Sequence, residues 1–271
     1  MRTRRRHGLP PPAGAALATR PIELATVFGG GGVFGIAFNL GIAEAFVDAG
    51  LDVGNAASLG TSAGAWAAAH LALGMRFESS FDAFRHAIPR RPDLRSGRMA
   101  ATCRDVFGAD TLCPSVRVGV VALPTLRREI LSGGDHRVAD LVAASSAVPG
   151  MLAPHRIDGV RYLDGGLRSM ASADLGDRAA RLLVVLPMSG PMFGPAGRLI
   201  ERRTIREIEV WRRRHRGAEV TVVRPTADIA ALVRRPDHLF DPDRARQCHE
   251  LAYGQGAELA TTWAAATTFA A

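Results

Sequence analysis

The chain has 271 residues, of which 47% are hydrophobic and 22% charged, a composition that suits a globular domain with a substantial core and excludes a disordered protein. Its net charge of +8 is carried by arginine, since the sequence contains no lysine, and an arginine-rich surface attracts anionic lipid headgroups or nucleic acid. The three cysteines show no CxxC spacing and support neither a disulfide framework nor a zinc site (Cys103, Cys113 and Cys248).

The first 21 residues form a basic, proline-rich segment that we expect to be a disordered tail ahead of the folded domain. No apolar stretch follows its arginines before the prolines at 10–12, so we expect no signal peptide. Residues 24–43 are uncharged and long enough to span a bilayer, but they contain six glycines. A buried strand, a glycine loop and a buried helix explain them better. We therefore expect a cytoplasmic protein that meets a membrane only at its surface.

Strands and helices are expected to alternate along the rest of the chain. Apolar runs predict strands at residues 22–28, 56–59, 116–123, 126–131, 181–186 and 219–223, and a hairpin at 153–163 that turns at Asp158-Gly159. Helices are expected at 36–49, 63–73, 138–146, 197–216 and 242–269. Because several strands are apolar throughout, this alternation predicts a three-layer α/β/α sandwich with a largely parallel central sheet.

Residues 75–114 interrupt the alternation. Phe77, Phe81 and Phe84 suggest one helix there, and Pro89-Arg90-Arg91-Pro92 forms a basic break. We expect this segment to be a cap or flap that faces the substrate, within a single catalytic domain at residues 22–271.

The sequence Gly60-Thr61-Ser62-Ala63-Gly64 lies where a short strand is expected to turn into an Ala- and Leu-rich helix. A serine at the apex of such a turn, with glycine two positions to either side, forms a GxSxG nucleophile elbow. Glycines are needed because a Cβ would clash with neighbouring backbone in so tight a turn. The turn presents the hydroxyl and directs a helix N-terminus at the developing oxyanion. Ser62 is therefore the candidate nucleophile.

The loop Gly30-Gly31-Gly32-Val33-Phe34-Gly35 fits two chemistries. It matches the GxGxxG pattern of dinucleotide sites, but the acid that such a site needs should end the second strand, and Asp52 precedes that strand. In the alternative that we favour, the amides of Gly30, Gly31 and Gly32 form an oxyanion hole. A purely structural turn is the third interpretation.

Ser62 also needs a base. In many hydrolases the catalytic residues follow the order serine, acid, histidine along the chain. Three histidines lie after the candidate acid, and none of them is at an obvious strand end (His215, His238 and His249). Asp164 is the better candidate, because it ends the predicted hairpin and is followed by Gly165 and Gly166, which allow close backbone approach. An ordinary Asp-Gly turn is the structural alternative.

These three motifs, in this order, resemble the patatin-like phospholipase family over about residues 22–223, and the segment Ala144-Ser145-Ser146-Ala147-Val148-Pro149-Gly150 is similar to the family's sequence upstream of its DG[GA] motif. The resemblance implies a patatin-like fold and a Ser–Asp dyad without histidine that hydrolyses acyl esters of lipids. Ser62 would be the nucleophile and Asp164 the general base. The glycine amides would hold the oxyanion, supported by the motif glycines (Gly35, Gly60, Gly64, Gly165 and Gly166).

The resemblance implies no cofactor, no metal and no nucleic-acid partner, and it leaves oligomeric state, acyl length and positional specificity open. Peripheral contact with an anionic membrane surface is compatible with the charge. Phe34 stands where family members often carry Arg or Lys, which predicts weaker oxyanion stabilisation or a changed headgroup preference. Two alternatives remain: a non-catalytic nucleotide- or lipid-binding module, and an esterase with a Ser-His-Asp triad.

Overall fold

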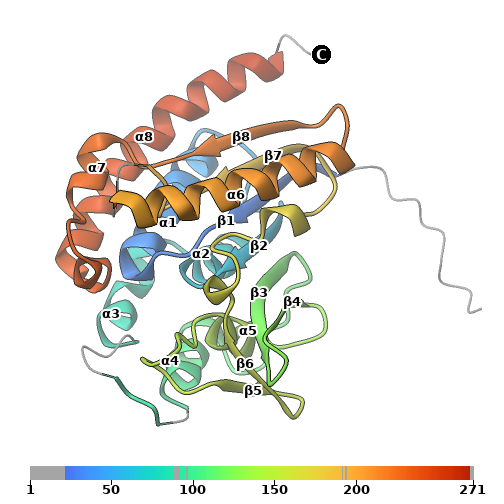
Figure 1. Cartoon of the computed structure of the whole chain (residues 1–271). Helices are drawn as coiled ribbons and strands as arrows, with labels where there is room; N and C mark the ends of the chain where they lie inside the picture. Colours follow the sequence, from blue (N-terminus) through green and yellow to red (C-terminus); the bar gives the residue numbers. More distant parts are fainter. Residues whose placement is uncertain (1–21, 88–91, 96, 191, 193, 269–271) are drawn as a thin grey trace, which may run out of the picture.

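A computed structural model of the chain (Figure 1) describes residues 22–87, 92–95, 97–190, 192 and 194–268. The tail expected at 1–21, most of the basic break at 89–92 and the end of the helix expected to reach residue 269 lie outside the described residues. In the part that is described, no helix is both long and apolar enough to cross a bilayer.

The described residues form one mixed sheet and the helices around it. The strands are β1 (Ile22–Phe28), β2 (Ala57–Thr61), β3 (Val116–Leu123), β4 (Arg127–Ser132), β5 (His155–Ile157), β6 (Val160–Asp164), β7 (Ala179–Val185) and β8 (Glu219–Val223). The α-helices are α1 (Gly32–Asp48), α2 (Ala63–Ala72), α3 (Phe77–Ala87), α4 (Arg98–Phe107), α5 (Val138–Ser145), α6 (Gly194–Arg214), α7 (Ala227–Ala231) and α8 (Pro242–Thr268). Three short 3-10 helices complete the list, η1 (Gly165–Leu167), η2 (Ala173–Leu175) and η3 (Pro236–Phe240).

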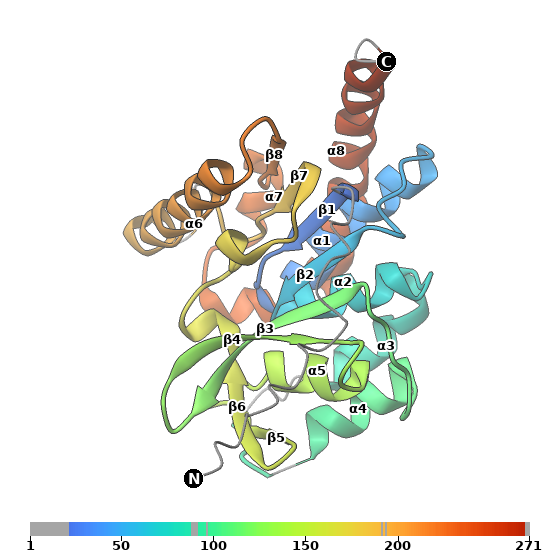
Figure 2. The same cartoon turned by 90° about the vertical axis from the view of Figure 1, so that its right-hand side faces the viewer.

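The sheet order is β5-β6-β3-β2-β1-β7-β8, and β4 pairs with β3 outside this path. The strands β3, β2, β1, β7 and β8 run parallel to their neighbours in this order, whereas β4, β5 and β6 are antiparallel. Figure 2 shows α6 on one side of the sheet and α1, α2 and α8 on the other. The predicted three-layer α/β arrangement with a largely parallel sheet is confirmed.

Helix α1 is the centre of the larger core. Residues 33–46 are all buried, so the helix is covered around its whole circumference rather than along one stripe, and Asn39 and Glu44 are its buried polar residues. It packs against α2 and α8, and Gly41 permits the second contact because a Cβ there would clash with the backbone of α8 at His249. On the opposite face of the sheet, Trp211 and Ile208 of α6 cover the smaller core.

Two details differ from the sequence prediction. Helix α1 begins at Gly32 rather than residue 36, so the last glycine of the run lies in its first turn. Helix α4 was not predicted, since only every fourth residue of its sequence is firmly apolar, yet Met99, Cys103 and Phe107 are buried in the larger core. The cap assignment for residues 75–114 stays a prediction.

Candidate active site

Strand β3 brings the two predicted catalytic segments together. Its residues 117–122 pair with β4 along one edge, which leaves the other edge for β2 and β6. Strand β2 runs parallel to β3 and ends with Thr61 opposite Gly119, and β6 runs antiparallel and ends with Asp164 opposite Val120. The two strands therefore lie end to end on one edge of β3, with their carboxyl ends facing each other.

The turn after β2 has the geometry of a nucleophile elbow. Ser62 has φ 54° and ψ −118°, a left-handed conformation that costs a non-glycine residue on the order of 1–3 kcal/mol. It lies immediately before α2, so the helix N-terminus begins beside its side chain. A Cβ at Gly60 would clash with the carbonyl of Gly64, and one at Gly64 would clash with the carbonyl of Phe28. These close contacts explain the two glycines of the motif.

The Ser62 hydroxyl lies close enough to the Asp164 carboxylate to lower the pKa of that carboxylate. Asp164 is only 5% exposed, and its Oδ1 also accepts the amide of Gly166 at 2.7 Å. Burial raises the pKa of Asp164 to about 6, while the hydrogen bonds from Ser62 and Gly166 act in the opposite direction. A Cβ at Gly165 would clash with the carbonyl of Gly119, so this glycine lets the segment lie against β3. The structure thus brings a hydroxyl close to a carboxylate whose pKa is raised.

A residue that the sequence did not single out fixes the serine backbone. Ser145, at the end of α5, accepts the Ser62 amide at 2.8 Å and donates its hydroxyl to the carbonyl of Gly119 at 2.8 Å. It is fully buried. The neighbouring Ser146 accepts the indole N–H of Trp66 at 3.0 Å. The similarity of residues 144–150 to a family segment was the one signal of this role in the sequence.

Replacing Ser145 by alanine should destabilise the protein by about 2–4 kcal/mol, because it leaves a buried amide and a buried carbonyl without their partner. Thermal or urea denaturation measures this loss. Ser146→Ala, which removes a bond to a side chain and leaves the elbow backbone alone, is the matched control. A loss of esterase activity in Ser145→Ala that exceeds the loss in Ser146→Ala is the expected sign of a displaced Ser62. Equal activities would contradict the positioning role.

The glycine loop lies against the elbow, but its amides have different uses. The amide of Gly30 donates to the carbonyl of Met170 at 2.8 Å, and the Gly29 amide donates to Val185. The Gly30 N–H therefore already has an acceptor in this structure, and its predicted role as an oxyanion donor stays a prediction. Gly32, at φ 62°, begins α1 and lines a pocket together with Ser62.

Two amides near the hydroxyl belong to first helical turns, where no intrahelical acceptor exists. They are those of Gly32 in α1 and Ala63 in α2. Gly35 lets the two helices approach, since a Cβ there would lie 3.0 Å from that of Ala63. The amide of Ala63 was not among the predicted donors, although the residue after an elbow serine commonly supplies one. Gly31 immediately precedes α1.

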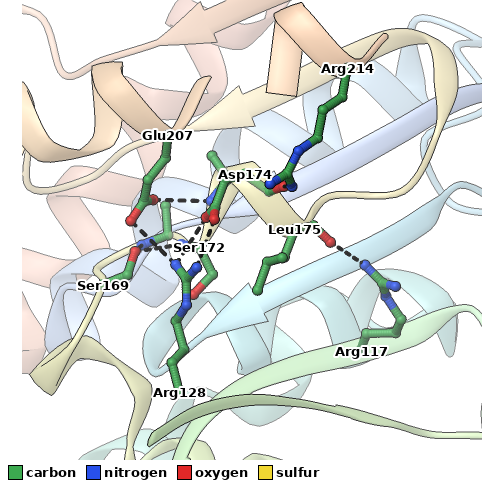
Figure 3. A network of polar contacts seen from close by, with 10 residues as sticks. Arg117, Arg128, Ser169, Ser172, Asp174, Leu175, Glu207 and Arg214 are labelled. Atoms are coloured by element: carbon green, nitrogen blue, oxygen red, sulfur yellow. Dashed lines mark hydrogen bonds and ion pairs between the residues drawn. The ribbon is translucent and has the colours of Figure 1, made fainter. Parts of the chain in front are cut away.

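The segment that carries Met170 is held by the polar network in Figure 3. Arg128 of β4 makes two hydrogen bonds to Asp174, at 2.9 and 2.7 Å, and a longer one of 3.4 Å to Glu207 of α6. Glu207 in turn accepts the amide of Ala173 and the hydroxyl of Ser169. Burial raises the pKa of Glu207, against the effect of these donors and of Arg128. The network therefore ties the chain after Asp164 to both β4 and α6.

Arg128→Leu should lower the free energy of unfolding by about 3 kcal/mol, because Asp174 and Glu207 would keep their partly buried charges without the cation. Denaturant titration at pH 7.5 measures it. Arg127→Leu, at a neighbouring exposed position with no recorded side-chain partner, controls for loss of charge. If the two variants unfold at the same denaturant concentration, the network does not stabilise the fold.

A small pocket opens beside Ser62. It is lined mainly by apolar side chains from α1, α2, α4, the chain after α5 and η3 (Ile36, Trp66, Met99, Val148, Met151, Leu152 and Phe240). Its volume of about 50 Å³ holds one or two water molecules, so a long acyl chain requires these side chains to move. Met99 and Met151 suit that role because methionine adapts its shape.

Phe34 does not face this pocket's opening to solvent but lies fully buried in the larger core. A cation at this position would need a buried partner. The predicted effect of Phe34 on headgroup preference stays a prediction.

The residues of the alternative interpretations have other partners. The ring of His215 bonds the carbonyl of Trp211 on α6, His238 bonds the amide of Arg234, and His249 pairs with Glu44 and stacks on Phe77. Asp52 accepts the side chain of Asn55 at an exposed turn. Among the described residues, no group of His, Cys, Asp and Glu could hold a metal ion.

The model of the patatin-like phospholipase family matches residues 125–176. The matched segment contains Arg128, Asp164, Gly165 and Gly166, whereas the glycine loop and Ser62 lie before it.

Uncharacterized NTE family proteins of Mycobacterium bovis and of two Mycobacterium tuberculosis strains are each 29% identical to this chain over 206 residues. The alignments cover 68% of this chain and 55% of those proteins, so the chain spans about half the length of the relatives it matches. The crystal structure of VipD from Legionella pneumophila superposes with a TM-score of 0.47 at 15% identity, covering 90% of this chain and 67% of that one.

Proposed function

The chain is similar to the patatin-like phospholipase family, as its motifs predicted, and on this premise we propose that it is a serine hydrolase that cleaves carboxylic ester bonds of lipids. The observation that carries the proposal is the approach of the Ser62 hydroxyl to the buried carboxylate of Asp164, close enough to lower the pKa of that carboxylate. A nucleophile and a base within hydrogen-bond reach are the minimum that acyl transfer requires.

In the first step, the Ser62 oxygen attacks the ester carbonyl and its proton passes to Asp164. The tetrahedral intermediate collapses to an acyl-enzyme as Asp164 returns the proton to the leaving alcohol. Water then attacks the acyl-enzyme, Asp164 takes a proton from the water, and the fatty acid leaves with the Ser62 oxygen reprotonated. Burial makes Asp164 a stronger base than an exposed aspartate, and its pKa of about 6 still leaves it mostly ionised at neutral pH.

The oxyanion that forms in each tetrahedral intermediate needs donors on the far side from Asp164. We assign this role to the amides of Gly31, Gly32 and Ala63. The N-termini of α1 and α2 add their dipoles to the same position. Donors of this kind contribute about 3–4 kcal/mol each to lowering the barrier.

Labelling with a fluorophosphonate probe tests the proposal, because such probes phosphonylate only an activated serine. We expect labelling of the native protein, an adduct that mass spectrometry maps to Ser62, and loss of labelling after heat denaturation. A panel of phospholipids, lysophospholipids, monoacylglycerols and p-nitrophenyl esters then identifies the substrate class. Absence of both labelling and hydrolysis, together with binding of NAD, would support the non-catalytic module instead.

Hydrolysis should depend on pH through Asp164. The folded-state pKa of this group is raised to about 6, so the protonated, inactive form dominates below pH 6 and the ionised base dominates above it. We expect kcat/KM for a p-nitrophenyl ester to rise tenfold per pH unit below pH 6 and to level off by about pH 7. A rise centred near pH 4 would show that burial does not raise this pKa.

A further inference from the structure

A second cavity, of about 480 Å³, adjoins the pocket beside Ser62. Four of its lining residues are arginines, Arg95, Arg104, Arg156 and Arg161, and none of its lining residues is an Asp or Glu. We call it the arginine pocket. Met99 and Leu152 line both it and the pocket beside Ser62, so the two cavities share a wall.

The arginines come from three separate parts of the fold. Arg95 precedes α4, Arg104 lies on α4, and Arg156 and Arg161 lie on the β5–β6 hairpin. Arg156 and Arg161 are paired directly across the two strands, a placement in which like charges repel. Both residues are exposed, and an anion held between the two guanidinium groups would offset this repulsion.

Two carboxylates near the pocket have partners other than its four arginine side chains, and one of these partners, His155, itself lines the pocket. Asp140 pairs with His155 at 3.0 Å, and Asp93 pairs with Arg98 at 2.7 Å. Arg156 donates one hydrogen bond to the carbonyl of Gly159. For Arg104 and Arg161, no ion pair is recorded among the described residues. The pocket therefore presents cationic groups that the protein itself does not neutralise.

We propose that the arginine pocket binds the phosphate of an acyl ester whose carbonyl lies at Ser62. This inference rests on the proposed function and narrows its substrate class to lipids with an anionic phosphate headgroup. The apolar wall of Met99 and Leu152 separates the phosphate from the ester, as the glycerol unit does in an acylglycerol phosphate. Arginine suits the role because its planar guanidinium binds phosphate through two parallel hydrogen bonds.

The test compares 1-lauroyl-glycerol-3-phosphate with uncharged 1-lauroylglycerol and p-nitrophenyl butyrate as substrates. In the double variant Arg104→Gln/Arg161→Gln, kcat/KM for the phosphate ester should fall about 10- to 100-fold, while the values for both uncharged esters stay within about twofold. The control Arg202→Gln/Arg206→Gln removes the same charge from exposed positions of α6 with no recorded ion pair. An equal fall in the control, or equal changes for all three esters, would overturn the proposal.

Binding separates failure of this inference from failure of the proposed function. Calorimetry with the non-hydrolysable ether 1-O-dodecyl-glycerol-3-phosphate needs no catalysis, and its affinity should fall about tenfold or more in Arg104→Gln/Arg161→Gln only. Inorganic phosphate, titrated alone, should bind more weakly than the ether lipid. If phosphate binds as tightly as the lipid, the pocket takes free phosphate and the substrate inference is wrong. If neither binds, it is also wrong, whatever the esterase assays show.

Discussion

Ser62→Ala is expected to lower kcat/KM for p-nitrophenyl ester hydrolysis by at least about 10³-fold, to the level of background hydrolysis. The hydroxyl oxygen is the atom that forms the acyl-enzyme in the proposed mechanism, and alanine has no group that can take its place. Its loss should leave the fold intact, because the Ser62 amide, which bonds Ser145, is unchanged. Steady-state kinetics and fluorophosphonate labelling of the same preparations measure the effect.

Two controls make this result interpretable. Ser169→Ala removes a hydroxyl from the segment after Asp164 and tests whether any change at the site stops hydrolysis. Thermal denaturation of Ser62→Ala checks that the protein is folded. If folded Ser62→Ala hydrolyses the ester at the wild-type rate, the nucleophile is another residue and the elbow is only a structural turn.

Asp164→Asn should have opposite effects on activity and stability. It removes the general base, so kcat/KM should fall by about 10³- to 10⁴-fold. It also removes a carboxylate whose folded-state pKa is raised to about 6 from 3.8. Since burial penalises the ionised form, wild-type stability declines as pH rises from about 4 to about 6. The variant should therefore be more stable above pH 6, by up to about 3 kcal/mol.

Urea denaturation at pH 4 and at pH 7.5 separates the charge from other consequences of the substitution. The stability advantage of Asp164→Asn should be present at pH 7.5 and should be mostly lost at pH 4, where the folded wild type holds a proton at this position and the unfolded wild type is partly protonated. Full activity in Asp164→Asn, with an inactive alanine variant at His215, His238 or His249, would replace the dyad with a triad.

Much of the fold followed from local sequence pattern. Strands β3 and β8 begin and end where their apolar runs predict, because each is bounded by polar or turn residues. Helix α4 escaped prediction because its buried residues are separated by Arg, Thr and Asp, and its burial depends on contacts with α3 and α5. Boundaries and weakly amphipathic helices depend on tertiary packing that the sequence does not display.

The residues of the candidate site also divide into those that could be predicted from the sequence and those that could not. Ser62 and Asp164 could be selected from glycine spacing, since each flanking glycine avoids a specific backbone clash. Ser145 could not, because a serine at a helix end has no distinctive pattern and its two partners are far away in the chain. The acceptor of the Gly30 amide could not be predicted for a related reason. A glycine run shows where backbone can approach, but the acceptor of each amide is set by a distant residue, here Met170.

Strands β2 and β6 lie end to end along β3. The pairing register of each strand with β3 therefore sets the position of its residue of the proposed dyad. A slip of β6 by one residue along β3 would shift Asp164 by about 3.3 Å and turn its side chain to the opposite face of the sheet. The same slip would leave Ser62 in place, since β2 pairs with a different part of β3. We therefore expect the proposed catalysis to tolerate an added residue at the Asp158-Gly159 turn under one condition. The extra residue must bulge out, so that β6 and β3 keep their pairing register.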